Sequence, residues 1–261
     1  MQCELKKITE WNNLLKTTQE LLTKTNLTFD HDKITIRDMD ETHTAFIHIS
    51  ISKNLFTNYK IFSTTELGID VANLYKILKN LKPPTCLKLH YSEDKSDGLS
   101  ILVYKDDTCK KRNYTLPLFS INSFNTEIKD LPISVSMTME SRKFYDLCTH
   151  LLLFDDSCTV HIDILKKQLK FSSYGDIGNV DIEYDEKDKH VELDFIKKDI
   201  TRFKQSFSLE KWKQFSQAYT LSDTVCLSFS KDSPLLVEYK LNDDLGFCRF
   251  YLAPKVDDSD F

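Results

Sequence analysis

The stretch DVANLYKILK, at residues 70–79, carries apolar residues at intervals of three and four. At about 100° per residue, such side chains fall on one stripe of an α-helix. The stripe consists of Val71, Leu74, Ile77, Leu78 and Leu81. The two stretches that follow, TCLKLHY (85–91) and LSILVYK (99–105), largely alternate apolar and polar residues, as half-buried antiparallel strands do. This order predicts a helix over residues 70–81 that buries one face against the strands after it.

A second copy of this arrangement follows later in the chain. SLEKWKQFS (208–216) precedes TVCLSFS (224–230) and LLVEYKL (235–241), at an offset of roughly 138 residues from the first copy. Apolar stripes at helical spacing predict four helices in all, over residues 8–22, 70–81, 141–152 and 209–219. Because each half reads helix, strands, helix, strands, the sequence predicts a duplicated domain.

We therefore expect an α+β fold of two similar domains, each with two helices packed on antiparallel sheets. The stretch PLFSINSFNTEIKDLPISV (117–135) has little periodicity and no helix pattern, which indicates an extended connector. The expected organisation is an N-terminal domain over residues 1–116, the connector over residues 117–135, and a C-terminal domain over residues 136–261.

The composition excludes several classes of protein. Of the 261 residues, 41% are hydrophobic and 29% are charged, which is typical of a folded chain that is neither disordered nor membrane-spanning. A formal net charge of −5 argues against a protein coated with nucleic acid, although a local basic surface is compatible with it. Only five glycines occur, and no glycine-rich phosphate loop is present. Because the seven cysteines form no CxxC pair, we expect reduced thiols in an intracellular protein, without a metal or cofactor.

No set of residues predicts catalysis. His43 and His48 are five apart in an expected strand, so they would point to opposite faces. Cys148 and His150 are two apart in an expected helix and would not face each other. Since no nucleophile, base and oxyanion donor come together, we do not expect an enzyme.

Four parts of the chain carry a family resemblance. They are IRDMDETHTAF (36–46), LGIDVANLYKILK (67–79), FSSYGDIGNVDI (171–182), and DSPLLVEYKL (232–241) with FYLAPKVDD (250–258). These stretches resemble the proliferating cell nuclear antigen (PCNA) family, the eukaryotic-type DNA sliding clamps. YLAPK followed by acidic residues is specific to this family, and the resemblance covers nearly the whole chain, as in a divergent or viral member.

The resemblance implies a homotrimeric ring that closes head to tail around double-stranded DNA, with strands outside and helices lining the hole. Such a ring acts as a polymerase processivity factor. It tethers DNA polymerase, the clamp loader and other replication and repair proteins that carry a short binding motif, and it catalyses no reaction. A modest basic lining attracts phosphates without reading sequence, so the ring slides. The implied location is the nucleus, or a cytoplasmic replication site for a viral protein.

Matching family positions assigns residues to two of the implied surfaces. The expected DNA-facing residues are Lys16, Lys76, Lys79, Arg142, Lys211 and Lys213. The expected partner-motif pocket consists of Met39, His43, Phe46, Ile128, Leu131, Pro132, Pro234, Tyr251, Ala253 and Pro254. Lining positions that depart from the basic family pattern are Asp146, Thr149, Glu210 and Gln217. Lys129 departs in the connector, where the family has an apolar pocket residue.

A ring that closes head to tail needs two different edges on each subunit. The candidates are CKKRNYTLPL (109–118) and GDIGNVDIEY (175–184), because each alternates and ends a run of strands. The expected interface residues are Lys110, Lys111, Arg112, Asn113, Tyr114, Leu116, Ile177, Gly178, Asn179, Val180 and Ile182. Lys166 aligns with the ubiquitin-acceptor lysine of the family, and an exposed turn lysine is the alternative interpretation.

Two alternatives to a homotrimeric clamp stay open. One is a related clamp, either a checkpoint-type subunit of a heterotrimer or a viral processivity factor that is monomeric or dimeric. The other is a protein-interaction scaffold that does not encircle DNA. The oligomeric state of the purified chain distinguishes the first alternative, and stimulation of a polymerase on primed circular DNA distinguishes the second.

Overall fold

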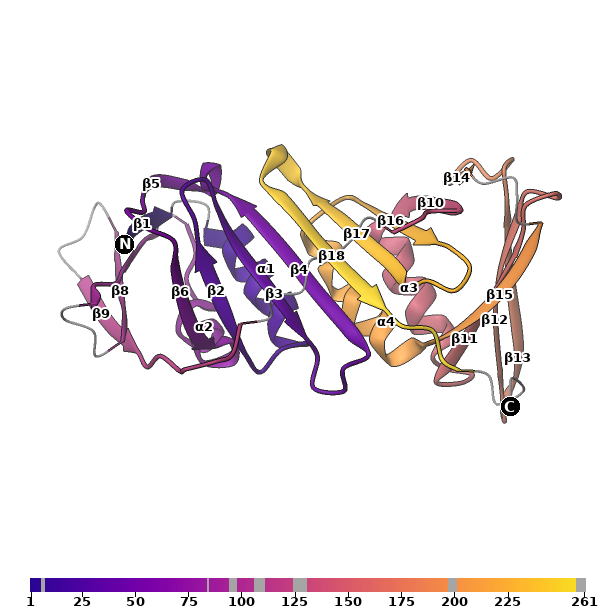
Figure 1. Ribbon diagram of the computed structural model, residues 1–261, viewed down its shortest axis with the longest axis horizontal. Helices are drawn as coiled ribbons and strands as arrows, with labels where there is room; N and C mark the ends of the chain where they lie inside the picture. Colours follow the sequence, from indigo (N-terminus) through magenta and orange to yellow (C-terminus); the bar gives the residue numbers. More distant parts are fainter. Residues whose placement is uncertain are drawn as a thin grey trace. The chain divides into compact units, whose positions relative to one another are not determined.

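The computed structural model shows four α-helices and 18 strands over the residues that it describes, 1–5, 8–83, 85–93, 98–105, 111–123, 131–196 and 201–256 (Figure 1). The helices are α1 (Ile8–Gln19), α2 (Val71–Leu78), α3 (Ser141–Leu151) and α4 (Leu209–Ser216). The first nine strands are β1 (Gln2–Leu5), β2 (Lys24–Phe29), β3 (Lys33–Met39), β4 (Ala45–Ser52), β5 (Phe56–Lys60), β6 (Thr65–Asp70), β7 (Thr85–His90), β8 (Leu99–Lys105) and β9 (Lys111–Leu116). The others are β10 (Val135–Glu140), β11 (Ser157–Asp163), β12 (Gln168–Gly175), β13 (Gly178–Asp185), β14 (Val191–Phe195), β15 (Arg202–Ser208), β16 (Thr224–Phe229), β17 (Leu235–Leu241) and β18 (Gly246–Leu252).

The order of these elements confirms the predicted duplication. Each half reads strand, helix, five strands, helix, three strands, so β1–β9 with α1 and α2 correspond to β10–β18 with α3 and α4. The strand orders correspond too. In the first repeat they are β5-β1-β7-β8-β9 and β4-β3-β2-β6, and in the second they are β14-β10-β16-β17-β18 and β13-β12-β11-β15. The strand pairs are antiparallel, as the alternating sequence pattern indicates.

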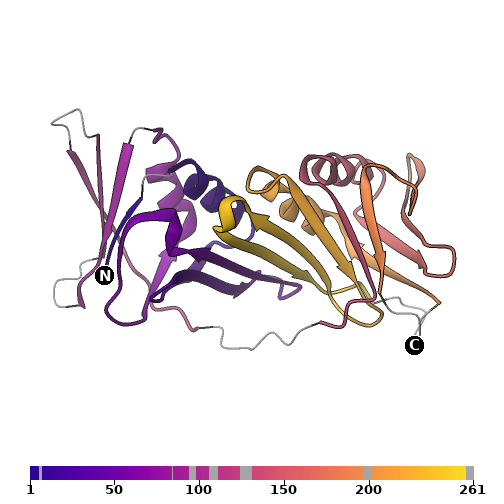
Figure 2. The ribbon, with the colours of Figure 1, turned by 90° about the horizontal axis from the view of Figure 1, so that it is seen from above.

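The chain folds as two compact units. The first consists of Met1–Glu41, Ile47–Asn125 and Leu241–Cys248, and the second consists of Thr42–Phe46, Thr126–Lys240 and Arg249–Phe261. Within each unit, the two helices lie together on one face of the strands (Figures 1 and 2). The sequence-based domain limits at residues 116 and 135 stay a prediction.

The two helices of the first unit are held together by packing and by one side-chain hydrogen bond. Trp11 and Leu15 of α1 and Leu74 and Leu78 of α2 are almost completely buried. The Nδ2 atom of Asn12 donates a hydrogen bond to the carbonyl of Leu78 at 3.0 Å. The same carbonyl, in the last turn of α2, also accepts a hydrogen bond from the backbone N–H of Leu81 at 2.8 Å.

In the second unit, Trp212 of α4 organises the core. Its ring centroid lies 5.9 Å from that of Phe144, 5.5 Å from that of Phe171 and 6.0 Å from that of Phe207. Each aromatic pair contributes about 0.5–1.5 kcal/mol beyond the burial of its surface. The contacts connect both helices to the sheet β13-β12-β11-β15, because Phe144 belongs to α3, Phe171 to β12 and Phe207 to β15.

All four helices end earlier than the sequence predicts. The prediction of α1 to residue 22 is wrong because Leu21 and Leu22 are buried in a turn, where both backbone N–H groups donate to the carbonyl of Thr18. At the end of α4, residues Gln217–Thr220 form a 3-10 turn. An apolar stripe therefore shows which side chains are buried, but a turn can bury them as well as a helix.

One strand prediction also needs correction. His43 does not lie in a strand with His48, because it precedes β4 in a turn and has a φ of 53°. His48 is buried within β4, with its ring centroid 4.9 Å from that of Phe247. His43 is exposed and His48 is buried, so the two side chains have different surroundings.

Candidate DNA-facing and partner-binding surfaces

The helices carry more basic than acidic side chains, which is the reverse of the whole chain. Six Lys or Arg residues lie in the four helices against three Asp or Glu residues, whereas the complete sequence has 35 basic and 40 acidic residues. Lys16 of α1 and Lys76 of α2 are exposed, as is Lys79 directly after α2. The apolar faces of the helices are turned into the units, so these cations stand on the remaining faces.

The cations of the second unit are held by neighbouring side chains. The guanidinium of Arg142 lies 5.0 Å from the ring centroids of Tyr145 and Tyr219, and its Nε atom lies 3.3 Å from Oδ1 of Asp146. The Nζ atom of Lys213 lies 3.2 Å from the ring centroid of Tyr145. Cation–π contacts of this kind keep a charge at the surface while restricting its position.

Two departures from the family pattern are explained by these contacts. Asp146 pairs with Arg142 one turn away, so the carboxylate partly neutralises the cation next to it. Thr149 accepts a hydrogen bond from the ammonium of Lys213. Lys211 is half-buried on α4. Of these two cations, Arg142 is therefore paired with an acid, whereas Lys213 donates to a neutral hydroxyl.

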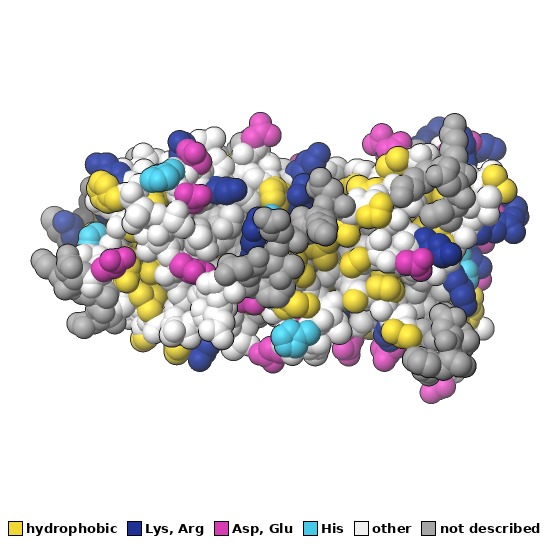
Figure 3. Space-filling model, viewed as in Figure 1, with side chains coloured by type: hydrophobic (Ala, Val, Ile, Leu, Met, Phe, Trp, Pro, Cys, Tyr) yellow, Lys and Arg dark blue, Asp and Glu magenta, His cyan; other side chains and the backbone are white. Residues whose placement is uncertain are grey.

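The aromatic residues of the expected pocket lie side by side in the second unit. The ring centroids of Tyr251 and Phe46 are 5.8 Å apart. The backbone N–H of Ala253 donates to the carbonyl of Thr44 at 3.0 Å, which fixes the chain after β18 beside the turn before β4. Phe250 is completely buried, whereas Tyr251 is half-buried, because successive side chains of a strand point to opposite faces. Hydrophobic side chains gather over β17 and β18 on the face shown in Figure 3.

The remaining pocket residues come from several elements. Leu131, Pro234 and Pro254 are half-buried, Pro132 and His43 are exposed, and all five belong to the second unit. Met39 is half-buried at the end of β3 in the first unit. Ile128, like Lys129, lies outside the described residues.

The two expected interface segments are edge strands. β9 is the last strand of the sheet β5-β1-β7-β8-β9, and β13 is the first strand of the sheet β13-β12-β11-β15. On β9, Tyr114 stands opposite the buried Ile101. On β13, Ile182 stands opposite the buried Phe171. These apolar residues therefore share the inner face of their sheets.

The other expected interface residues follow this alternation on β13 but not on β9, where Arg112 is exposed although it stands opposite the buried Val103. Lys111, Arg112 and Asn113 are exposed on β9, and Leu116 is buried at its end. Asn179 is exposed and Val180 half-buried on β13. Ile177, in the turn before β13, is 71% exposed, and Gly178, the first residue of β13, has a φ of 137°, a conformation that favours glycine. Lys110 lies outside the described residues.

Lys166 lies in the turn between β11 and β12. Its backbone N–H donates to Oδ1 of Asp163 at 3.0 Å, and its side chain is exposed. The neighbouring Lys167 has a φ of 54° and forms an ion pair with Glu186. The two lysines thus have different surroundings, which the sequence does not show.

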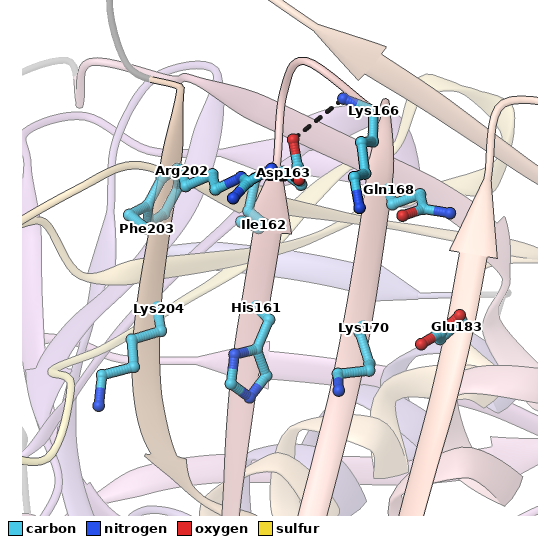
Figure 4. A pocket seen from close by; sticks show the side chains of 10 residues that line it. All are labelled: His161, Ile162, Asp163, Lys166, Gln168, Lys170, Glu183, Arg202, Phe203 and Lys204. Carbon is cyan, nitrogen blue, oxygen red and sulfur yellow. Dashed lines mark hydrogen bonds and ion pairs between the residues drawn. The ribbon is translucent and has the colours of Figure 1, made fainter.

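One polar groove lies apart from the expected DNA-facing and partner-motif residues, although Lys166 and Glu183, from the expected modification site and edge segment, line it. It is on the sheet β13-β12-β11-β15, has a volume of about 490 Å³, and is lined by side chains from all four strands (Figure 4). In the sequence, the polar residues of the groove are the polar positions of alternating strands. The strand pairing that brings these positions together cannot be read from the sequence.

Among the described residues, no three His, Cys, Asp or Glu side chains come together as a metal site requires. No helix in the described part of the chain is long and apolar enough to cross a membrane. The six described cysteines are free thiols.

Comparison with known proteins agrees with this geometry. The family model of the PCNA N-terminal domain matches residues 1–127, and that of the PCNA C-terminal domain matches residues 127–255. The proliferating cell nuclear antigen of Caenorhabditis elegans is 30% identical over 253 residues, which cover 95% of this chain and 94% of the relative. That of Chaetomium thermophilum is 28% identical and covers 93% of both chains.

A solved structure shows the same fold. The crystal structure of proliferating cellular nuclear antigen from Entamoeba histolytica superposes with a TM-score of 0.86 at 23% identity, and the match covers 98% of both chains. Because both family models and a relative of almost equal length match the chain, it belongs to the proliferating cell nuclear antigen family of DNA sliding clamps.

Proposed function

We propose that this clamp acts as a homotrimeric ring whose subunits join through β9 of one copy and β13 of the next. The observation that supports it is the correspondence of the repeats. β9 corresponds to β18, and β13 corresponds to β4. β9 and β13 are free edge strands. Their counterparts in the other repeat, β18 and β4, are neighbours in the strand order.

Hydrogen bonds at both ends of this internal pair support a joint of the same kind between subunits. In the first unit, the N–H of Ser52 donates to the carbonyl of Leu245 at 2.8 Å, and in the second unit, the N–H of Ala253 donates to that of Thr44. Pairing β9 with β13 in the same way satisfies two exposed rows of backbone groups. A joint between unlike edges is heterologous and therefore generates a closed ring or an open filament.

Side-chain chemistry favours this pairing over β9 with β9 or β13 with β13. On the face away from Tyr114 and Ile182, β9 contributes the exposed cation Lys111, whereas β13 contributes the exposed carboxylates of Asp181 and Glu183. Like charges repel across identical edges, and unlike charges attract across different ones. The half-buried apolar residues Tyr114 and Ile182 would meet on the inner face.

In this ring, the helices would face duplex DNA through Lys16, Lys76, Lys79, Arg142, Lys211 and Lys213. Lysine and arginine side chains attract phosphates whatever the base sequence, so the proposed contact is electrostatic and independent of sequence. The proposed ring needs no catalytic group or cofactor. It stays on DNA because it is closed around the duplex.

The Tyr251–Phe46 surface would receive the partner motif of polymerases, the clamp loader and repair proteins. Its residues fit a helix-in-groove site, with aromatic side chains on the floor and prolines on its borders. We infer a nuclear location from the eukaryotic relatives.

Size-exclusion chromatography with light scattering tests the ring. The chain has a mass of 30.5 kDa, so we expect a particle of about three times this mass at micromolar concentration. Val180→Asp should dissociate it, because the carboxylate enters the inner face of the joint. Glu192→Lys on β14, an exposed position of another edge strand, serves as the control. A monomeric wild-type chain, or a trimer that persists in Val180→Asp, would refute the proposed joint.

A further inference from the structure

A basic row of three residues crosses the groove on the sheet β13-β12-β11-β15. Strand registers place Lys204 of β15 opposite His161 of β11, and His161 opposite Lys170 of β12. Figure 4 shows the three side chains at the same level on neighbouring strands. Neighbouring strands lie about 4.8 Å apart, so the two lysines flank the imidazole from both sides.

The neighbouring rows on this face of the sheet pair complementary groups. On one side of the basic row, Arg202 stands opposite Asp163, and its Nε atom lies 2.8 Å from Oδ2 of that carboxylate. On the other side, Thr159 stands opposite Ser206, and their hydroxyl groups share a hydrogen bond of 2.9 Å. Like charges that stand opposite each other destabilise a sheet, so the basic row departs from its surroundings. Departures from a local rule are expected at functional sites.

Acids of the same sheet neutralise the basic row only in part. Lys170 stands opposite Glu183 on β13, and its Nζ atom lies 3.5 Å from Oδ2 of Asp181. The charged side chains that line the groove are the cations of Lys166, Lys170, Arg202 and Lys204 and the carboxylates of Asp163 and Glu183. The lining thus has two more positive than negative charges, and one more when Asp181 at its border is counted. Protonation of His161 brings this excess back to two.

His161, at the centre of the basic row, lacks a hydrogen-bond partner. Its Nε2 atom is buried and has none within the described residues, whereas buried polar atoms in proteins almost always have one. Burial lowers the pKa of the imidazole below its ordinary value, and Lys170 and Lys204 lower it further, whereas Asp181 acts in the opposite direction. An anion beside the ring would accept a hydrogen bond from Nε2 and favour the protonated form.

The groove has room for an anion at this row. Its volume is about 490 Å³, and all three residues of the basic row line it. A lysine ammonium sits on a flexible stem of four carbons, so the two lysines can turn their ammonium groups toward one anion above the imidazole. A single phosphate ion fills only a part of this volume. A phosphate group that is attached to a larger molecule therefore fits as well.

We propose that the groove binds a phosphate group with two negative charges, which Lys204 and Lys170 hold from either side and His161 holds from the sheet. The two ammonium groups and the protonated imidazole donate hydrogen bonds to the phosphate oxygens. Inorganic phosphate and a phosphorylated side chain of a partner protein share this chemistry. The site is separate from the expected DNA-facing residues and from the surface around Tyr251, so it does not depend on either assignment.

The titration of His161 in the full-length protein, followed by NMR with isotope-labelled histidine, tests the site with inorganic phosphate as the probe. A bound dianion favours the protonated ring, so the pKa of His161 should rise as phosphate is added and reach a plateau. The charged groups around the ring, which the addition leaves unchanged, are Lys204 and Arg202 on β15, Lys170 on β12, Asp181 and Glu183 on β13, and Asp163 on β11. The exposed His90 of the first unit should not respond.

Two double variants with the same change in net charge separate the site from a general attraction. Lys170→Gln with Lys204→Gln should weaken phosphate binding at His161 by about 10-fold, because each exposed ion pair contributes a small factor. Lys231→Gln with Lys240→Gln removes two exposed lysines elsewhere in the second unit and should leave the dissociation constant unchanged. Equal weakening by both variants, or a response of His161 that rises without a plateau, would overturn the proposal.

Two further probes test the ligand chemistry and its source. Acetate at matched ionic strength carries one negative charge and should bind more weakly than phosphate; equal binding would overturn the assignment of a dianion. The peptide acetyl-Gly-phosphoserine-Gly-amide, compared with its unphosphorylated form, distinguishes the two sources. Tighter binding of the phosphopeptide than of inorganic phosphate would support a phosphorylated partner, and the reverse order would support free phosphate. Binding of neither would refute the site.

Discussion

Replacing Asp146 by Asn should increase the affinity of the clamp for duplex DNA. Asp146 lies 3.3 Å from the Nε atom of Arg142, and the two side chains are 60% and 53% exposed. Because the pair is so exposed, its loss should cost only about 0.3–0.5 kcal/mol of folding free energy. The guanidinium stays in place through its contacts with Tyr145 and Tyr219 and becomes available to a phosphate.

The magnitude follows from counterion release. One additional phosphate contact per subunit gives three in the proposed ring, which steepens the slope of log K against log salt by about 2.7. Between 200 and 50 mM salt, the gain in affinity on lowering the salt should then be up to about 40-fold larger than in the wild type.

Fluorescence anisotropy of a short labelled duplex, titrated at several salt concentrations, measures this slope. Asp32→Asn is the matched control, because Asp32 is also exposed, is also paired with a lysine, Lys53, and lies outside the four helices. If Asp146→Asn and Asp32→Asn have the same slope, then Arg142 does not face DNA or its ion pair does not mask it, and the reasoning is refuted.

Three further predictions concern other surfaces. Lys76→Glu with Lys79→Glu should reduce processivity on primed circular DNA without changing the affinity for motif peptides; undiminished synthesis would show that other residues line the hole. Tyr251→Ala should weaken peptide binding by about 30-fold, the loss of about 2 kcal/mol typical of an aromatic anchor, while light scattering still shows a trimer. An unchanged dissociation constant in calorimetry would reject the pocket assignment. Burial raises the pKa of the Cys158 thiol to about 12, so iodoacetamide at pH 8 should label the half-buried Cys226 and not Cys158 in the native protein. Equal labelling by mass spectrometry would contradict this.

The periodicity of the sequence was enough to predict the elements and their repetition. Val71, Leu74 and Leu78 at helical spacing indicate a buried helix face, and all three are buried. Such patterns are local, because the pitch of a helix or the pleat of a strand brings residues of one segment to one face. The ends of the helices were predicted too late, because Leu21 and Leu22 are buried by a turn that depends on packing.

The contacts at the candidate sites also differ in whether the sequence could predict them. The ion pair of Arg142 and Asp146 follows from their spacing of four on a helix, so it was accessible from the sequence. The contact of Phe46 with Tyr251 was accessible only through the family resemblance, since no local rule joins residues so far apart.

By itself, the sequence determined the secondary structure, the duplicated order of the elements and, through its resemblance, the family. Only the tertiary structure decided which side chains became neighbours. Lys204, His161 and Lys170 form one row because β15, β11 and β12 pair in a particular register, and a shift by one residue would turn each of these side chains to the other face. Register depends on the burial of the opposite face, where Phe171 and Phe207 meet Trp212. Contacts across strands thus result from the packing of the whole unit.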